Sequence, residues 1–225
     1  GSIVDSLVRQ YNSNLVIRHS GASQCAHFVH TNNTSHCFSQ FGSGTLAGAR
    51  TYLGPKMLIN PLTLDDEAKH LQEKGIGNPY ENLFIDENCI IITPFHKAMN
   101  KLVELSRGNN RYSSCAQGVW ETVKDNLNQG EDFTIRVKDI ESGIFLDKLN
   151  LIQAYKQYEL NKIRRNIDQS FEFDINFGIL FDKNLNNHDL NYRYQLFCSK
   201  INIIKDNGIS LINSSNCPVF EGNQG

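Results

Sequence analysis

The chain has 225 residues, of which 40% are apolar and 20% are charged, and its formal net charge is −2. A chain of this size and composition buries a real core, which excludes extensive disorder. Because acidic and basic residues nearly balance, no basic field is present to gather nucleic acid or a membrane surface. No run of 18 apolar residues predicts a membrane-spanning helix.

Helical periodicities and short β-rich runs alternate along the chain. The expected helices are residues 2–11, 64–74, 94–106, 119–127, 148–165 and 191–206. The expected strands are residues 14–18, 28–29 and 37–41 (a hairpin), 56–59, 83–85, 89–92, 133–137, 209–212 and 218–220. This alternation predicts an α/β fold with a mainly parallel central sheet flanked by helices. Since no linker divides the sequence, we expect a single α/β domain over residues 1–225.

Six cysteines are scattered through the sequence without a C-x-x-C pair. This spacing favours reduced thiols, and the first residues lack the charged-then-apolar layout of a signal peptide. We therefore expect a cytoplasmic protein.

Three polar loops, residues 21–27, 112–118 and 221–225, combine small residues with hydroxyl or amide side chains. Two of them directly follow apolar β runs, and ligands of open α/β sheets bind beyond the carboxyl ends of strands. Hydroxyl and amide groups donate and accept at short range without adding charge, which suits a purine edge or a phosphate.

His27 is the titratable group of greatest interest in these loops. An imidazole there can act as a general acid near neutral pH or stabilise charge on a transferring phosphoryl group. A histidine that merely hydrogen-bonds to the loop backbone is the alternative reading. His96, in the first turn of an expected helix, is interpreted as a packing or capping residue, and Phe38, Phe41 and Trp120 as core.

A zinc site is a further alternative, because cysteines and histidines crowd into 13 residues. They are Cys25, His27, His30, His36 and Cys37. Their spacing matches none of the usual zinc arrangements, and His27 and His30 would point to opposite faces of a strand.

Several motifs, in this order and separation, resemble the adenylosuccinate synthetase family. Residues 1–5 (GSIVD) are similar to the GKIVD stretch of that family, which begins at the end of its GDEGKG phosphate loop. Residues 16–27 (VIRHSGASQCAH) are similar to VVRYQGGHNAGH, and residues 92–100 to the LPYHKALD helix start. Residues 113–118 occupy the place of GTTGRG, and residues 220–225 (FEGNQG) match FEGAQG.

The resemblance implies a P-loop-NTPase-like synthetase fold, present in part, and a ligase of purine and AMP biosynthesis. Such a ligase joins L-aspartate to C6 of IMP through a 6-phosphoryl intermediate, with hydrolysis of GTP and with Mg²⁺. It also implies a homodimer.

The same resemblance implies roles for individual residues. His27 matches the catalytic histidine that assists phosphoryl transfer, and Gln24 matches a nucleotide-binding asparagine. Ala26 matches a glycine whose backbone carbonyl binds Mg²⁺, and Gln224 matches a glutamine that contacts the nucleotide.

Other positions depart from the family pattern. The paired threonines that hold the nucleotide phosphate fall on Ser114 and Cys115, and a thiol is a weaker donor than a hydroxyl. Gln117 stands in place of an arginine, and residues 41–46 differ from LLPSGIL. Counting on from that loop, the arginine that the family supplies across its dimer interface falls on Gln129. These changes favour, as an alternative, a divergent synthetase that acts on a guanine nucleotide, like the phage synthetases of diaminopurine precursors.

Both ends of the sequence look cut. The phosphate loop with the general base is expected before Gly1, and the guanine- and aspartate-binding regions after Gly225. We therefore expect that these 225 residues alone do not catalyse the ligation. A catalytically inactive nucleotide-binding or dimerising module is the alternative from a different class.

Overall fold

The computed structural model of the chain describes residues 1–31, 34–110, 112, 114–164, 167, 175–181 and 187–223. Two compact units emerge, which we name the sheet unit (residues 1–90, 136–138 and 195–225) and the helical unit (residues 91–135 and 139–194). The single domain expected over residues 1–225 stays a prediction. None of the described helices combines the length and apolar character needed to cross a membrane.

The sheet unit is built on a five-stranded sheet in the order β8-β6-β4-β1-β9. Its strands are β1 (Leu15–Arg18), β4 (Arg50–Leu53), β6 (Leu83–Asp86), β8 (Asn202–Ile204) and β9 (Val219–Glu221). All four pairings are parallel, which confirms the predicted sheet type. Every residue of β1 is buried, as expected for a strand covered on both faces.

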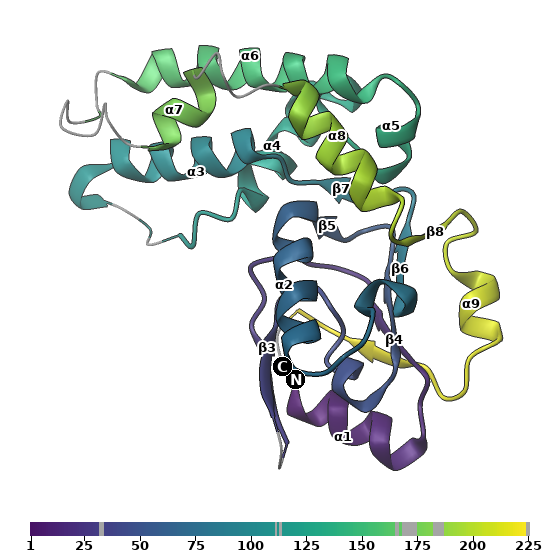
Figure 1. The fold of residues 1–225 in the computed structure, drawn as a ribbon. Helices are drawn as coiled ribbons and strands as arrows, with labels where there is room; N and C mark the ends of the chain where they lie inside the picture. The colour runs from purple at the N-terminus through teal and green to yellow at the C-terminus, as the bar shows by residue number, and fades with distance from the viewer. Residues whose placement is uncertain are drawn as a thin grey trace. The chain divides into compact units, whose positions relative to one another are not determined.

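Helices cover both faces of this sheet (Figure 1). Val8 of α1 (Ser2–Tyr11) packs with Val16 and Ala49, whereas Leu211 of α9 (Ile209–Asn213) packs with the neighbouring residues Leu15 and Ile17. Because successive side chains of a strand point to opposite faces, the two clusters lie on opposite sides of β1. The core of the unit is therefore two apolar layers separated by the sheet.

A hairpin and a helix complete the part of this unit that matters for the site. The strands β2 (His27–His30) and β3 (Ser35–Phe38) pair antiparallel, as predicted. α2 (Pro61–Glu73) begins three residues before the predicted start, because the Asn60 side chain accepts from the backbone N–H groups of Leu62 and Thr63. Short strands β5 (Leu58–Ile59) and β7 (Ile90–Ile91) lie within the strands predicted at residues 56–59 and 89–92.

The helical unit packs around α3 (Pro94–Ser106), which contacts α4, α6 and α7. Their bounds are Val119–Gln129, Phe145–Ile163 and Ile175–Phe181. α3 has the predicted ends, and Thr93 and His96 form a capping box at its start, so the capping role of His96 is confirmed. α5 (Val137–Glu141) and α8 (Asn187–Cys198) complete the α-helices of the described chain, with 3₁₀ turns at Thr45–Ala47, Pro79–Asn82, Gly108–Asn110 and Glu131–Phe133.

Several local predictions were wrong. Residues 209–212 form α9 instead of a strand, because the Asp206 carboxylate accepts from the N–H groups of Gly208 and Ser210 and starts a helix. Residues 133–137 form no strand: a 3₁₀ turn ends at Phe133 and α5 begins at Val137. The helix expected to reach residue 206 ends at Cys198, and β8 follows it.

Two aromatic predictions were confirmed and one was wrong. Phe38 and Phe41 are core residues, whereas Trp120 is 62% exposed on α4. The strand β4, which pairs with β1, was not predicted at all.

Candidate functional site

The topology of the sheet places a crevice beside β1. The chain runs from β1 to β4, β6 and β8 on one side, and β9 then joins the other side of β1. Loops that leave β1 and β9 therefore diverge, and such switch points are where open α/β sheets bind ligands. The loop after β1 contains residues 21–27, which were predicted to bind a ligand because they are small and polar.

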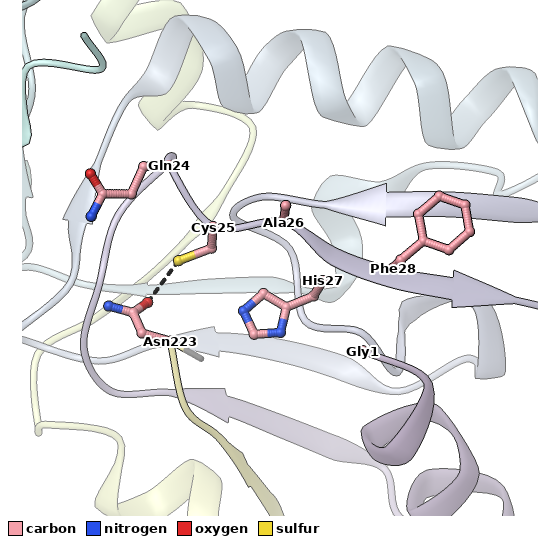
Figure 2. Close-up of a pocket in the computed structure, with 7 residues that line it drawn as sticks. All are labelled: Gly1, Gln24, Cys25, Ala26, His27, Phe28 and Asn223. Atoms are coloured by element: carbon pink, nitrogen blue, oxygen red, sulfur yellow. Dashed lines mark hydrogen bonds between the residues drawn. The ribbon is translucent and has the colours of Figure 1, made fainter. Parts of the chain in front are cut away.

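A pocket of about 470 Å³ lies at this point (Figure 2). Its lining consists of Gly1, Gln24, Cys25, Ala26, His27, Phe28 and Asn223. Three of the predicted site residues, Gln24, Ala26 and His27, are thus brought together. Gln224 lies outside the described residues.

His27 is the first residue of β2, and its side chain is only 6% exposed. Its Nδ1 lies 3.1 Å from Oε1 of Glu221, so the carboxylate charge faces this side of the ring. Among the described residues, Nε2 has no hydrogen-bond partner. An unpartnered buried polar atom in a pocket wall marks the atom that is free to meet a ligand.

Glu221, which sequence reasoning did not single out, fixes the imidazole. It ends β9, pairs in register with Arg18 of β1, and is almost fully buried. Ser43 donates to it twice, through its backbone N–H to Oε2 at 3.0 Å and through its hydroxyl to Oε1. Ser43 can approach because Gly44 has no Cβ, which would lie 2.7 Å from Val16 Cγ2. The sequence signal that could have identified Glu221 is an acidic residue at the end of an apolar strand.

The electrostatic surroundings keep His27 neutral. Burial lowers its pKa, the charge of Glu221 partly opposes this, and the guanidinium of Arg18 lowers the pKa further. Arg18 is fully buried and donates through Nη1 to the carbonyl oxygens of Ser39 (2.6 Å) and Phe41 (3.3 Å). A charged group that enters the pocket would therefore change the protonation state of His27.

The second predicted loop lies in the helical unit and is described there by itself. Ser114 and Cys115 are exposed, and Gly118 caps the start of α4. The Ser114 hydroxyl accepts from the N–H of Ala116 at 3.1 Å, and Asn100 accepts from the N–H of Gly118. The loop thus presents a hydroxyl and a thiol just before a helix N-terminus.

The described residues offer little support for a zinc site. No three of the side chains Cys25, His27, His30, His36 and Cys37 bring ligand atoms within 4.8 Å of one another in the described chain. His27 is buried and His30 is exposed, as expected for opposite faces of β2.

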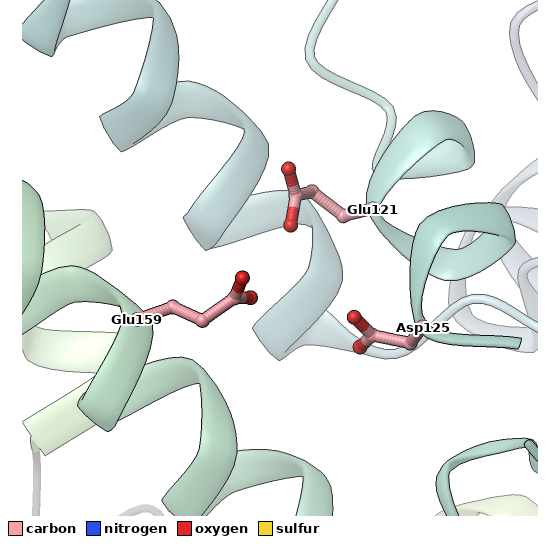
Figure 3. A group of neighbouring side chains, drawn as sticks. All are labelled: Glu121, Asp125 and Glu159. Atoms are coloured by element: carbon pink, nitrogen blue, oxygen red, sulfur yellow. The ribbon is translucent and has the colours of Figure 1, made fainter. Parts of the chain in front are cut away.

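One other acidic group in the described chain has the spacing of a metal site: Glu121, Asp125 and Glu159 (Figure 3). The ammonium group of Lys156 already contacts all three, at 2.9, 2.6 and 2.8 Å. We name these four residues the Lys156 cluster. Its positive charge is supplied by the protein, so it is a buried ion network of the helical unit.

Comparison with known proteins identifies the family. The adenylosuccinate synthetase family model matches residues 1–192. The chain belongs to the adenylosuccinate synthetase family. Adenylosuccinate synthetase of Borrelia duttonii is 28% identical over 174 residues, which are 77% of this chain and 39% of that protein. The enzyme of Francisella tularensis is 29% identical over 130 residues, which are 57% of this chain and 30% of that protein.

Two solved structures share the fold. Fully ligated adenylosuccinate synthetase from Plasmodium falciparum aligns with a TM-score of 0.72 and 15% identity, over 100% of this chain and 48% of that one. Cyanophage S-2L succinoaminodeoxyadenylate synthetase, bound to dGMP and dATP as an energy donor, aligns with a TM-score of 0.53 and 14% identity. That match covers 100% of this chain and 49% of the cyanophage chain. The chain therefore spans about half the length of these solved structures. Its matches to the sequence relatives cover less than half of their length.

Proposed function

We propose that the protein is a purine-nucleotide ligase that joins L-aspartate to C6 of a 6-oxopurine nucleotide, IMP, with GTP as the phosphoryl donor. The observation that carries this proposal is His27, whose Nε2 is unpartnered in the pocket wall while Glu221 holds Nδ1. Family membership supplies the reaction type, and the pocket supplies the residues.

The reaction has two bond exchanges. A base takes the proton from N1 of the purine, the O6 oxygen attacks the γ-phosphorus of GTP, an O6–P bond forms, and the bond to the bridging oxygen breaks, so that GDP leaves with the electron pair. The amino nitrogen of aspartate then attacks C6, loses a proton, and displaces inorganic phosphate. Positioned donors lower such barriers by matching the charge on the transferring group.

His27 is suited to that task because its charge responds to the substrate. Its lowered pKa keeps it neutral in the ligand-free pocket, with Nδ1 beside the Glu221 carboxylate. An anionic phosphoryl group beside Nε2 raises that pKa, so Nε2 takes up a proton and donates a hydrogen bond. The Glu221 carboxylate stabilises the resulting imidazolium from the other side.

Mg²⁺ fits the described lining only as an ion that is held mainly by substrate. Mg²⁺ prefers oxygen ligands, often a few from protein and the rest from phosphates and water. The lining residues include no carboxylate, and both oxygens of Glu221 already accept hydrogen bonds from Ser43. Ala26 would hold the ion through its backbone carbonyl. When bound, the ion offsets negative charge on the phosphates.

A separate anion contact is proposed within the helical unit by itself. Ser114 and Cys115 would bind a nucleotide phosphate, because they are exposed just before α4 and a helix N-terminus favours an anion. The hydroxyl is the stronger donor of the two.

The test is aspartate-dependent phosphate release from GTP with IMP, with the succinylated nucleotide identified by mass spectrometry, on the protein at its natural length. We expect His27→Asn to lower kcat by about 100-fold or more while nucleotide affinity changes little. Glu221→Gln removes the charge that raises the pKa of His27, so the pH profile shifts toward acid. His30→Asn, exposed on the same strand, is the matched control. Unchanged turnover in His27→Asn would contradict the proposal.

A guanine nucleotide as substrate is the second candidate. The departures at Cys115 and Gln117 change the nucleotide phosphate contact, and the cyanophage structure that shares the fold binds dGMP and dATP. Running the same assay with dGMP and dATP separates the two. Nucleotide binding without turnover under either condition would favour an inactive nucleotide-binding or dimerising module.

A further inference from the structure

Two positions of the pocket wall depart from the family motifs and contact each other. Cys25 stands where VVRYQGGHNAGH has alanine, and Asn223 stands where FEGAQG has alanine. The Cys25 thiol donates to Oδ1 of Asn223 at 2.7 Å, although the two residues are 198 positions apart (Figure 2). Two alanines at these positions would make no such hydrogen bond.

This contact fixes which way the Asn223 amide faces. In this contact the thiol donates to the amide oxygen, so the amide nitrogen faces elsewhere. Gly21, at φ 111°, lies directly against the amide, and a Cβ on Gly21 would overlap the Asn223 side chain. The amide is therefore held between the Cys25 thiol and the Gly21 backbone.

The amide nitrogen is left available to a ligand. In Figure 2 it lies on the side of the amide away from Cys25 and His27. Within the described part of the chain, no group accepts a hydrogen bond from Nδ2. Asn223 Nδ2 and the unpartnered Nε2 of buried His27 are thus two nitrogen atoms of the pocket lining that can bind a ligand.

The lining decides what kind of acceptor this donor meets. None of its residues carries a charged side chain while His27 is neutral, and the Gln24 side chain adds another uncharged amide. The two neutral amides, Gln24 and Asn223, match the neutral carbonyl of a nucleobase, whereas the phosphoryl group is left to His27, which gains a charge when it is protonated.

We propose that Asn223, oriented by Cys25, is a specificity-determining residue that donates through Nδ2 to the 6-oxo group of a purine nucleotide. A 6-aminopurine presents a donor at the same place and is disfavoured. This inference rests on the proposed function, since it names which feature of the purine the same pocket selects. Cys25 is the positioning residue, and Asn223 makes the contact.

The experiment is calorimetric titration of the purified chain with IMP and with AMP, which gives the ratio of the two dissociation constants. Asn223→Ala removes the donor, and we expect the preference for IMP to fall by about fivefold, the usual value of one hydrogen bond. Asn223→Asp replaces the donor with an acceptor, so the preference should fall further or reverse.

Two variants of Cys25 test whether it orients the Asn223 amide or only packs against it. Cys25→Ala frees the amide to turn over and should lower the preference by a few-fold, whereas Cys25→Ser keeps a donor and should restore it. Cys37→Ala, an exposed cysteine on β3, is the matched control.

Failure of this inference and failure of the proposed function give different results. An IMP preference that stays the same in Asn223→Ala, Asn223→Asp and Cys25→Ala overturns the role of Asn223 and leaves the proposed function standing. A chain that binds neither nucleotide, at concentrations where its fold is intact by circular dichroism, counts against both. Equal loss in Cys25→Ala and Cys25→Ser overturns the positioning role of Cys25.

Discussion

Replacing Lys156 with methionine removes the positive charge that three carboxylates share in the helical unit. Lys156 and Asp125 are fully buried, and Glu121 is nearly so. After the change, Lys124 still lies 2.8 Å from both Glu121 and Glu159. Among the described residues, Asp125 keeps only the hydrogen bond with His96 Nε2 at 3.2 Å, so it becomes the uncompensated buried charge.

The expected loss follows from that one orphaned carboxylate. Removing one partner of a buried ion pair typically costs about 3–5 kcal/mol of unfolding free energy. In the native protein burial tends to raise the pKa of Asp125, but the His96 hydrogen bond and the Lys156 charge outweigh it and lower the pKa. In Lys156→Met the lowering contributions of Lys156 are lost, so the pKa of Asp125 rises and the carboxylate binds a proton more readily than in wild type.

Urea unfolding followed by far-ultraviolet circular dichroism measures the effect at pH 7 and pH 5. Because folded Asp125 binds a proton more readily in the variant than in wild type, the deficit relative to wild type should shrink as the pH falls. Lys69→Met is the control, since its ion pair with Asp66 is 67% exposed and worth at most about 1 kcal/mol. Asp125→Asn added to Lys156→Met should recover part of the loss. A deficit at pH 7 no larger than that of Lys69→Met would refute the reasoning.

Two further predictions concern stability. Burial lowers the pKa of His96, despite the opposing hydrogen bond and charge of Asp125, so the unfolded chain binds the proton more tightly than the folded one. Stability should therefore fall as the pH drops below about 6.5, by at most about 1.4 kcal/mol per pH unit, and His96→Gln should flatten that slope in urea titrations. The Tyr52 hydroxyl donates to the buried Asp86 carboxylate at 2.9 Å, so Tyr52→Phe should cost about 1.5–3 kcal/mol. A Tyr52→Phe protein as stable as wild type would show that Asp86 is satisfied without this bond.

Part of the fold was readable from the sequence because local chemistry and global structure agree there. Thr93 and Pro94 start α3 at the predicted residue, since a β-region cap followed by proline is preorganised for a helix. The polar residues after β1 predicted the pocket, since they follow a strand that is apolar enough to be buried.

Other parts depended on contacts that the sequence does not display. Residues 209–212 are rich in isoleucine and leucine, which favour a strand, but the cap from Asp206 outweighs that preference. Glu221 became the partner of His27 only because β9 pairs with β1. Lys156 has the sequence context of a solvated helical lysine, and its burial is set by carboxylates on α4.

The pairing of β1 with β9 also sets an order of assembly. His27 and Cys25 leave the ribosome long before Glu221 and Asn223, whose contacts with them span up to 198 positions of sequence. Closing so long a loop is slow compared with forming the β2–β3 hairpin, so the imidazole exists first without its carboxylate. We therefore expect the pocket beside β1 to be complete only after β9 docks late in folding.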